Sequence, residues 1–309
     1  MKASAFKPNS QTIRTLDKFQ NSYVSGRAKG RIYVDEVRLN GWQGKNLAFG
    51  IADDDDAIFS DIDADAIAGL ANDAVSTFPV GYRQRTFLRC FEQQDDPDAG
   101  TFSVNLNYDT PSSIHFGGIG PSQFGTLEFI PLRKPAGFYV TEAQYVVGTS
   151  NPESRTSVVY DTGSAVIIVP LKTAIQLFDR LKVVKHATPD GLLLGLYECE
   201  SQLEVLQIKL GGKSLFMRKK EMTLGRFRIS RGKDAGKVMC VMSILALTDS
   251  DIADTWILGG PFFGMAYVTF DSRGSRIGIA DKHTFELTRI PHRVDIVDPR
   301  KPGGGKRGG

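Results

Sequence analysis

The stretch VVYDTGSAVIIV, residues 158–169, places one acidic residue between two apolar runs. Asp161 opens the small turn Asp-Thr-Gly-Ser, where the side chains on either side favour buried strands. Burial disfavours the ionised form of a carboxyl, so a carboxylate at this place is costly to keep. Asp161 is therefore a candidate for proton-transfer chemistry. Such chemistry normally needs a second carboxyl, and no second D-[ST]-G-[ST] turn occurs in the 309 residues.

The composition is that of an ordinary globular protein. Hydrophobic residues make up 41% and charged residues 24%, and 309 residues are enough for two domains. The net charge of +3 is too small to predict a nucleic-acid partner. No apolar stretch reaches transmembrane length, so no membrane partner is expected. The four histidines show no ligand spacing, and neither a metal nor another cofactor is predicted.

Three cysteines, at positions 90, 199 and 240, fit neither a disulfide scaffold nor a zinc cluster. The simplest prediction is that two of the three cysteines form one disulfide and the third is a free thiol. The first seven residues contain no apolar signal segment. Taken literally, this predicts a cytoplasmic protein, unless the natural N-terminus lies upstream.

Short strands punctuated by glycine dominate the pattern. Phe102, Val104, Leu106 and Tyr108 alternate with polar residues, which predicts a half-buried strand. Residues 32–39 predict another strand, and residues 265–270 with 276–279 predict a hairpin.

Two segments are predicted to be helical. Pro170 precedes the amphipathic series Leu171, Ala174, Ile175, Phe178 and Leu181, and residues 83–94 form a weaker case. Residues 283–309 are polar, basic and rich in glycine, so we expect them to be disordered.

The motifs, in this order, resemble those of the pepsin-like aspartic proteases over roughly residues 5–282. The matching stretches are FKPNSQT (6–12), SYVSGRAKG (22–30), DAIAGLA (65–71), IHFGGIGPS (114–122), the segment 131–139, VYDTGSA (159–165) with Pro170, and WILGGPFF (256–263) with the segments 267–271 and 277–280. Any one of these is weak alone, and together they are specific.

The resemblance implies a mostly β, bilobal acid-protease fold in which each lobe supplies one Asp to a shared cleft. It divides the chain into a partial N-terminal lobe (1–133), a C-terminal lobe (134–282) and the basic tail (283–309). It assigns the roles of the following residues: Asp161 catalytic; Thr162, Gly163 and Ser164 supporting, with Ser164 hydrogen-bonded to the carboxyl; Tyr23, Ser25 and Gly26 in a flap over the cleft; and Cys199–Cys240 as a disulfide. Cys90, beside Phe91 on the predicted helix, is expected to be a buried free thiol.

One departure from the family pattern bears on activity. In the family the first D-[ST]-G precedes the motif that begins here at Phe6, and none of the five residues before Phe6 is acidic. We therefore expect a truncated N-terminal lobe without the first catalytic Asp. Asp109, which Pro111 follows, and Asp17, which has no apolar flank, are poor substitutes. A symmetric dimer with one Asp from each chain is a further alternative, but it would have to displace residues 5–133.

The function that follows is an aspartic-type endopeptidase, inactive as this chain alone, with a peptide or protein substrate and a monomeric state. The resemblance implies secretion or a vacuole-like compartment if the N-terminus is incomplete. The alternative is a non-catalytic homologue that binds peptide or protein. Val24 in place of the flap glycine and Gly260 in place of an acidic residue favour that alternative.

Overall fold

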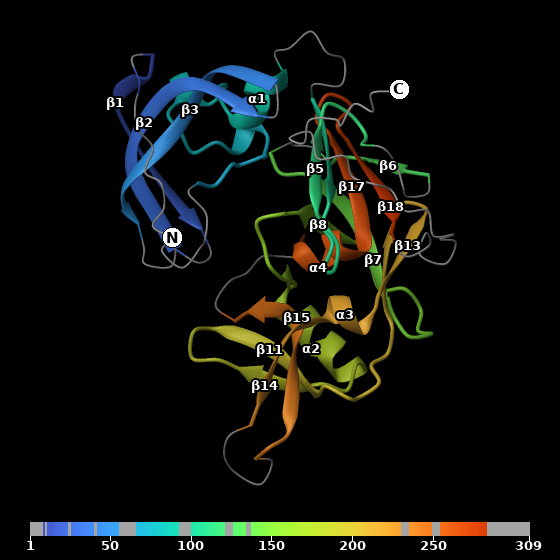
Figure 1. The fold of residues 1–309 in the computed structure, drawn as a ribbon. Helices are drawn as coiled ribbons and strands as arrows, with labels where there is room; N and C mark the ends of the chain where they lie inside the picture. Colours follow the sequence, from blue (N-terminus) through green and yellow to red (C-terminus); the bar gives the residue numbers. More distant parts are fainter. Residues whose placement is uncertain are drawn as a thin grey trace, which may run out of the picture.

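The structure, a computed structural model, describes residues 9, 11–23, 26–39, 42–55, 66–92, 100–120, 126–133, 137–229, 235–248 and 254–282. Within these residues the fold is mostly β and is built on three sheets (Figure 1). Four short helices accompany them in the described part: α1 (Phe87–Glu92), α2 (Leu171–Arg180), α3 (Lys219–Met222) and α4 (Gly260–Met265).

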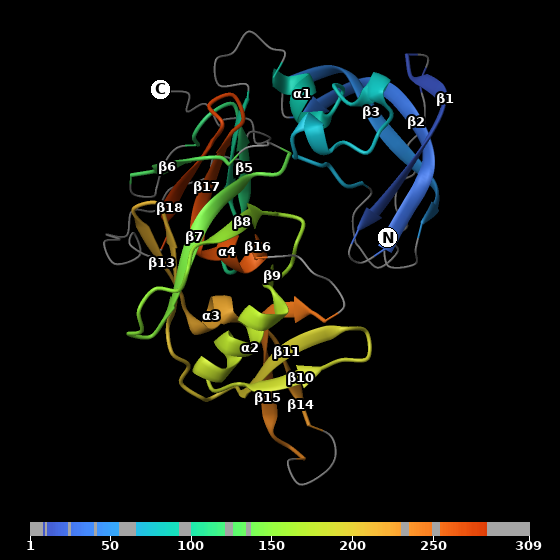
Figure 2. The ribbon, with the colours of Figure 1, turned by 180° about the vertical axis from the view of Figure 1, so that it is seen from behind.

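The first sheet lies on one flank of the molecule, beside α1 (Figure 2). It consists of the antiparallel strands β1 (Ile13–Tyr23), β2 (Gly26–Leu39) and β3 (Trp42–Asp55). Its core is small, with four buried side chains: Phe19, Ile32, Val34 and Ala48. The short 3-10 helices η2 (Asp73–Val75) and η3 (Val80–Tyr82) follow this sheet in the chain.

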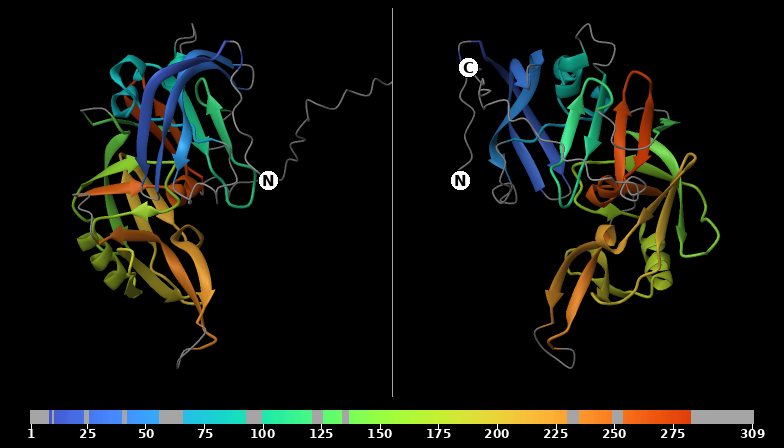
Figure 3. Two further views of the ribbon diagram at one scale, coloured as in Figure 1. Left: turned by 90° about the vertical axis from the view of Figure 1, so that its left-hand side faces the viewer. Right: turned by 45° about the vertical axis from the view of Figure 1, so that its right-hand side comes forward.

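The second sheet combines strands from both halves of the sequence, which lie side by side in Figure 3. Its order is β5 (Ser113–Phe116), β4 (Thr101–Asn105), β17 (Ala266–Asp271), β18 (Arg276–Asp281) and β6 (Glu128–Pro131). The ring of Phe102 on β4 stacks on that of Phe270 on β17 with centroids 4.5 Å apart. The two halves therefore share one hydrophobic core.

The third sheet belongs to the C-terminal half. Its order is β10 (Val184–Ala187), β11 (Leu192–Glu198), β15 (Val238–Leu247), β9 (Ile167–Ile168), β16 (Thr255–Leu258), β8 (Thr156–Tyr160), β7 (Val140–Val147), β12 (Leu206–Leu210) and β13 (Lys213–Met217), with β14 (Thr223–Arg228) pairing β15. Trp256 is its largest fully buried side chain. No described helix is long and apolar enough to cross a membrane.

The two predicted helices are present with different bounds. The helix after Pro170 is confirmed as α2, in which Ala174, Leu177 and Phe178 are buried. Ile175, assigned to the apolar face, is 39% exposed, because the buried stripe is narrower than the sequence indicates. The helix predicted over residues 83–94 is shorter, since α1 begins at Phe87.

The strand predictions hold with two corrections. Residues 32–39 lie in β2, and the C-terminal hairpin is confirmed as β17 and β18, although Met265 ends α4. The strand predicted to reach Tyr108 ends at Asn105. Its Ser103, expected to face solvent, is 1% exposed, and its buried hydroxyl is satisfied by hydrogen bonds to Gly118 O and Thr269 Oγ1.

The predicted fold class, mostly β and bilobal, is confirmed. The division at residue 133 stays a prediction, and the second sheet crosses it. The motif at residues 6–12, Val24, Ser25, Asp65 and the tail 283–309 lie wholly or largely outside the described residues.

Candidate active site

The Asp161 turn leaves the end of β8 and returns as β9 on the other side of β16. β16 runs parallel to β8, with Leu258 opposite Tyr160, and it pairs with β9 through Ile257 and Ile168. The turn therefore wraps around the end of a central, buried strand. The backbone N–H of Asp161 donates to Leu258 O at 3.1 Å, which fixes the start of the turn.

The start of α4 supports the other side of the turn. The N–H of Gly260 donates to Ser164 O at 2.8 Å. A Cβ atom on Gly259 would lie closer than 3.0 Å to the carbonyl oxygens of Ser164 and Val166. Glycine at 259 therefore allows the close approach that this support requires.

The carboxylate of Asp161 is half-buried and lightly bonded. Its Oδ1 accepts a hydrogen bond from Gly163 N at 2.9 Å. That is its one hydrogen bond to the part of the chain that the structure describes. A carboxylate has about four acceptor sites, so most of them remain available for a water, a ligand or a second carboxyl.

Ser164 does not bind the Asp161 carboxyl, contrary to the prediction. Its hydroxyl donates to Val166 O at 2.9 Å. A hydroxyl has one proton, so this bond leaves none for Asp161. The Ser164 side chain thus stabilises the turn through a bond to the turn's own backbone.

A buried hydroxyl pair lies at the base of the turn. The hydroxyl of Tyr160 is 2.8 Å from Thr141 Oγ1, and both side chains are buried. Burial raises the pKa of Tyr160 well above its usual range. Tyr160 is therefore a neutral, fixed support directly before Asp161.

The predicted flap is a hairpin, and its tip lies partly outside the described residues. Tyr23 and Gly26 pair at the ends of β1 and β2, with Val24 and Ser25 between them. Tyr23 is 41% exposed, which leaves its ring accessible. Asp161 has no hydrogen bond to the described part of this hairpin, so the placing of Tyr23 over the cleft stays a prediction.

The two other carboxyls weighed as substitutes have structural partners. Asp109 forms an ion pair with Lys220 on α3. Asp17 accepts a hydrogen bond from the hydroxyl of Tyr82 at 2.8 Å. Whether either residue replaces a catalytic Asp is not tested by these contacts, so their exclusion stays a prediction.

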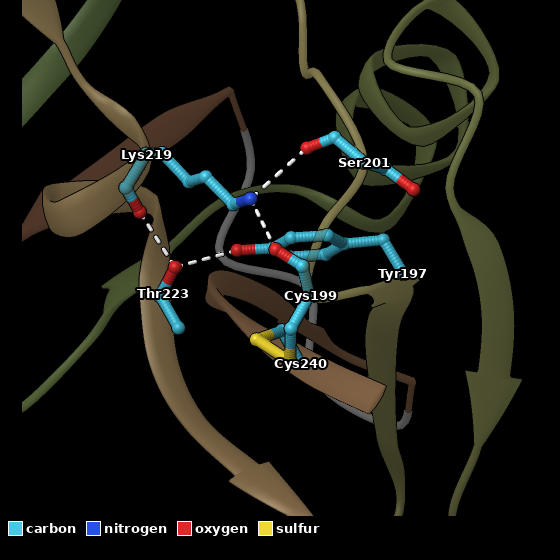
Figure 4. Close-up of a disulfide and its surroundings, with 6 residues drawn as sticks. All are labelled: Tyr197, Cys199, Ser201, Lys219, Thr223 and Cys240. Carbon is cyan, nitrogen blue, oxygen red and sulfur yellow. Dashed lines mark hydrogen bonds between the residues drawn. A yellow bond between two sulfur atoms is a disulfide. The ribbon is translucent and has the colours of Figure 1, made fainter. Parts of the chain in front are cut away.

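The Cys199–Cys240 disulfide is confirmed, with the two Cα atoms 5.0 Å apart. Figure 4 shows its surroundings: the Lys219 ammonium reaches the carbonyl oxygens of Cys199 and Ser201. Thr223 then links Lys219 O to the hydroxyl of Tyr197. Cys90 is the buried free cysteine.

One buried cation escaped the sequence analysis. Lys282 is 6% exposed, and its ammonium donates to carbonyl oxygens of Leu106 and Phe263. No sequence signal marks it, because it stands next to the polar tail. In the described part of the chain, no cluster of His, Cys, Asp and Glu is suited to a metal ion.

Comparison with known proteins supports the resemblance. At 28% identity the chain is similar to secreted aspartyl protease 1 of Malassezia globosa, over 86% of this chain and 63% of that protein. At 24% identity it is similar to major aspartyl peptidase 1 of Cryptococcus neoformans, over 88% and 58%. The chain thus spans about three fifths of the length of these curated relatives.

A solved structure has the same fold. The crystal structure of aspartic proteinase from Irpex lacteus superposes with a TM-score of 0.70 at 21% identity, over 91% of this chain and 85% of that one. A family model described as eukaryotic aspartyl protease matches residues 2–282. The chain therefore belongs to the eukaryotic aspartyl protease family.

Proposed function

We propose that Asp161 is one of the two carboxyls of an aspartic-type endopeptidase site that acts on peptides or proteins. The observation that carries this proposal is the turn itself. Leu258 and Gly260 fix its backbone, while the Asp161 carboxylate keeps most of its acceptor sites open. A general base needs this combination of a fixed position and free lone pairs.

The chemistry requires a partner for Asp161. In a pair, one carboxylate takes a proton from a water as the water attacks the peptide carbonyl, and the other, protonated, donates to the carbonyl oxygen. Two carboxyls this close titrate as a unit, because both cannot be ionised at once. Asp161 can take either role, so we propose that it belongs to the pair and do not assign it to the base or the acid step.

The chain contains one D-[ST]-G turn, so we infer that it holds half of the pair. Half a pair can bind a peptide but cannot activate the water and protonate the carbonyl together. We therefore expect the 309-residue chain to bind a statine-type peptide inhibitor weakly and to cleave no peptide bond.

The test compares the purified chain with Asp161→Asn at acidic pH. Cleavage of an unfolded protein substrate is followed by mass spectrometry, and inhibitor binding by calorimetry. We expect no cleavage by either protein and binding that Asp161→Asn weakens. Acid cleavage by the wild type that Asp161→Asn abolishes would show that this chain supplies both carboxyls.

The second candidate is a non-catalytic homologue that binds peptide or protein. Gly260 favours it, because the family has an acidic residue at this position. Mapping the 5′ end of the transcript separates the two candidates. An upstream in-frame D-[ST]-G supports the endopeptidase, and an in-frame stop directly before Met1 supports the binding protein.

We further propose that the protein works outside the cytosol. The Cys199–Cys240 disulfide favours an oxidising compartment, and the Malassezia globosa relative is named a secreted protease. Detection of the oxidised chain in culture medium tests this, and confinement to the cytosol with both thiols reduced contradicts it.

A further inference from the structure

A cavity of about 360 Å³ lies between β3 and the segment that leads into α1. Lys45 and Asn46 come from β3, while Gln84 and Arg85 come from the turn after η3. Val80, Gly81 and Cys90 complete the described part of the lining. The volume is within the range of small-molecule sites.

Four side chains in this lining carry hydrogen-bond donors that have no acceptor among the described residues of the protein. In the described part of the chain, no side-chain hydrogen bond or ion pair involves Lys45, Asn46, Gln84 or Arg85. The Arg85 guanidinium lies over the Tyr82 ring at 5.8 Å, a contact that leaves its N–H groups unpaired. Two cations and two amides therefore line one hollow, and none of these four side chains is hydrogen-bonded to a described protein group.

The described carboxyls close enough to influence the cavity have other partners. Glu36, whose pKa Lys45 helps to lower, binds Arg38 and Gln43. Asp73, which lies near Cys90, accepts a hydrogen bond from Thr86 and faces Arg89. None of the described residues that line the cavity is acidic. The positive charge of Lys45 and Arg85 is therefore not neutralised by a described residue of the lining.

We propose that this cavity binds a small dianion, a phosphate or a compact dicarboxylate, through Lys45 and Arg85. The planar guanidinium of Arg85 presents paired N–H donors that match two oxygens of either group. Lys45 supplies the second charge, and the amides of Asn46 and Gln84 supply neutral donors. The bound anion links β3 to the segment before α1, because each side contributes one cation.

Two features of the backbone define the walls of the cavity. Asn46 has φ of 60°, a left-handed conformation that asparagine tolerates better than most residues. Ala48 N donates to Arg85 O at 2.9 Å, which holds β3 and the Arg85 turn together. The backbone that carries the two cations is thus held in place before any ligand binds.

Anion binding is measured directly by isothermal titration calorimetry, because the Cys90 thiol in the lining is buried and unsuited as a chemical reporter. The full 309-residue chain is titrated at constant ionic strength with inorganic phosphate and, in parallel, with succinate. We expect at least one of the two anions to give a saturable heat with one site per chain.

Variants assign the binding to the two cations. Lys45→Met and Arg85→Met are each expected to weaken the anion about tenfold or more, because each removes a charge-assisted hydrogen bond. Arg85→Lys keeps the positive charge but loses the paired N–H donors of the guanidinium. Its affinity for the anion is expected to lie between those of the wild type and Arg85→Met. Arg226→Met, on the distant and exposed strand β14, is the charge-matched control and leaves affinity unchanged.

Two results overturn the proposal. One is that neither anion gives a saturable binding heat. The other is that Lys45→Met and Arg226→Met weaken binding equally, which would indicate attraction to net charge alone. Lys45 is exposed, so Lys45→Met decides the question even if Arg85→Met fails to fold. The relative affinities of phosphate and succinate then distinguish a phosphoryl ligand from a carboxylate ligand.

Discussion

The ammonium of Lys282 donates a hydrogen bond to the carbonyl oxygen of Phe263, in the last turn of α4, at 2.8 Å. The same nitrogen donates to Leu106 O and lies 3.5 Å from Asn107 Oδ1, directly after β4. The backbone N–H of Lys282 donates to Met265 O. One residue thus joins the end of β18 to α4 and to the N-terminal half of the sequence.

This burial makes stability depend on pH in a defined direction. Desolvation lowers the pKa of Lys282 from 10.5 to about 8. Between these pH values the unfolded chain binds more protons than the folded one, so the contribution of Lys282 to the free energy of unfolding rises with pH. The full change amounts to ~3 kcal/mol.

Lys282→Met should remove this rise. Between pH 7.5 and 10.5 we expect the wild type to gain up to ~3 kcal/mol relative to Lys282→Met. Urea unfolding at several pH values measures the difference. Cys90, whose pKa burial raises to about 11, acts in the opposite direction above pH 9 but is present in both proteins. Lys172→Met, at an exposed position on α2, should keep the wild-type slope. If the free energy of unfolding depended on pH in the same way for the wild type and Lys282→Met, the prediction would be wrong.

Removing the disulfide should cost a large part of the stability. Cys199 and Cys240 are 41 residues apart, and closing a loop of this size stabilises a protein by ~4 kcal/mol through the unfolded chain. Denaturant unfolding of the paired variant Cys199→Ser with Cys240→Ser tests this against Cys90→Ser, which leaves the loop closed. A loss no larger than that of Cys90→Ser would show that the link contributes little.

The sequence predicted those parts of the fold whose signals are local or fixed in order. α2 follows from Pro170 and a helical spacing, and the β17–β18 hairpin from two strands around a turn. Ser103 was assigned to solvent because alternation cannot show that a strand is covered on both faces. The hydroxyl of Ser103 finds a partner in Thr269 on the neighbouring strand β17, 166 residues away, which no local pattern reveals.

The candidate active site was likewise predicted only in part. The Asp161 turn and the cysteine pair were found from ordered motifs, whereas the Ser164 bond was assigned to the wrong oxygen. A turn serine has several acceptors within reach, and the choice of Val166 O depends on backbone geometry. Lys282 and the Lys45–Arg85 cavity depend on contacts between distant segments, so sequence spacing gave no sign of them.

The Ser164 hydroxyl should support the turn, and its neighbour should not. Ser164→Ala removes the bond to Val166 O and is expected to lower the free energy of unfolding by about 1 kcal/mol. Thr162 is exposed and has no hydrogen bond in the described structure, so Thr162→Ala should change stability by less than ~0.5 kcal/mol. Urea denaturation of both variants checks this. Equal effects would mean that the Ser164 bond does not hold the turn.

Two adjacent glycines give the sharpest test of how the Asp161 turn is supported. A Cβ on Gly259 would collide with the carbonyl oxygens of Ser164 and Val166, which are backbone atoms and cannot rotate away. A Cβ on Gly260 would have its nearest neighbours at 3.7 Å, an ordinary contact. Gly259→Ala is therefore expected to destabilise the protein by ~3 kcal/mol or more, the scale of a severe steric substitution.

Gly260→Ala should be neutral or stabilising by up to ~1 kcal/mol, because alanine favours a helix over glycine. It also keeps the N–H that donates to Ser164 O. Thermal and urea unfolding of the two variants, together with inhibitor binding at acidic pH, gives the comparison. If Gly259→Ala were as stable as Gly260→Ala, the end of β16 would not lie against the turn, and the assigned position of Asp161 would be wrong.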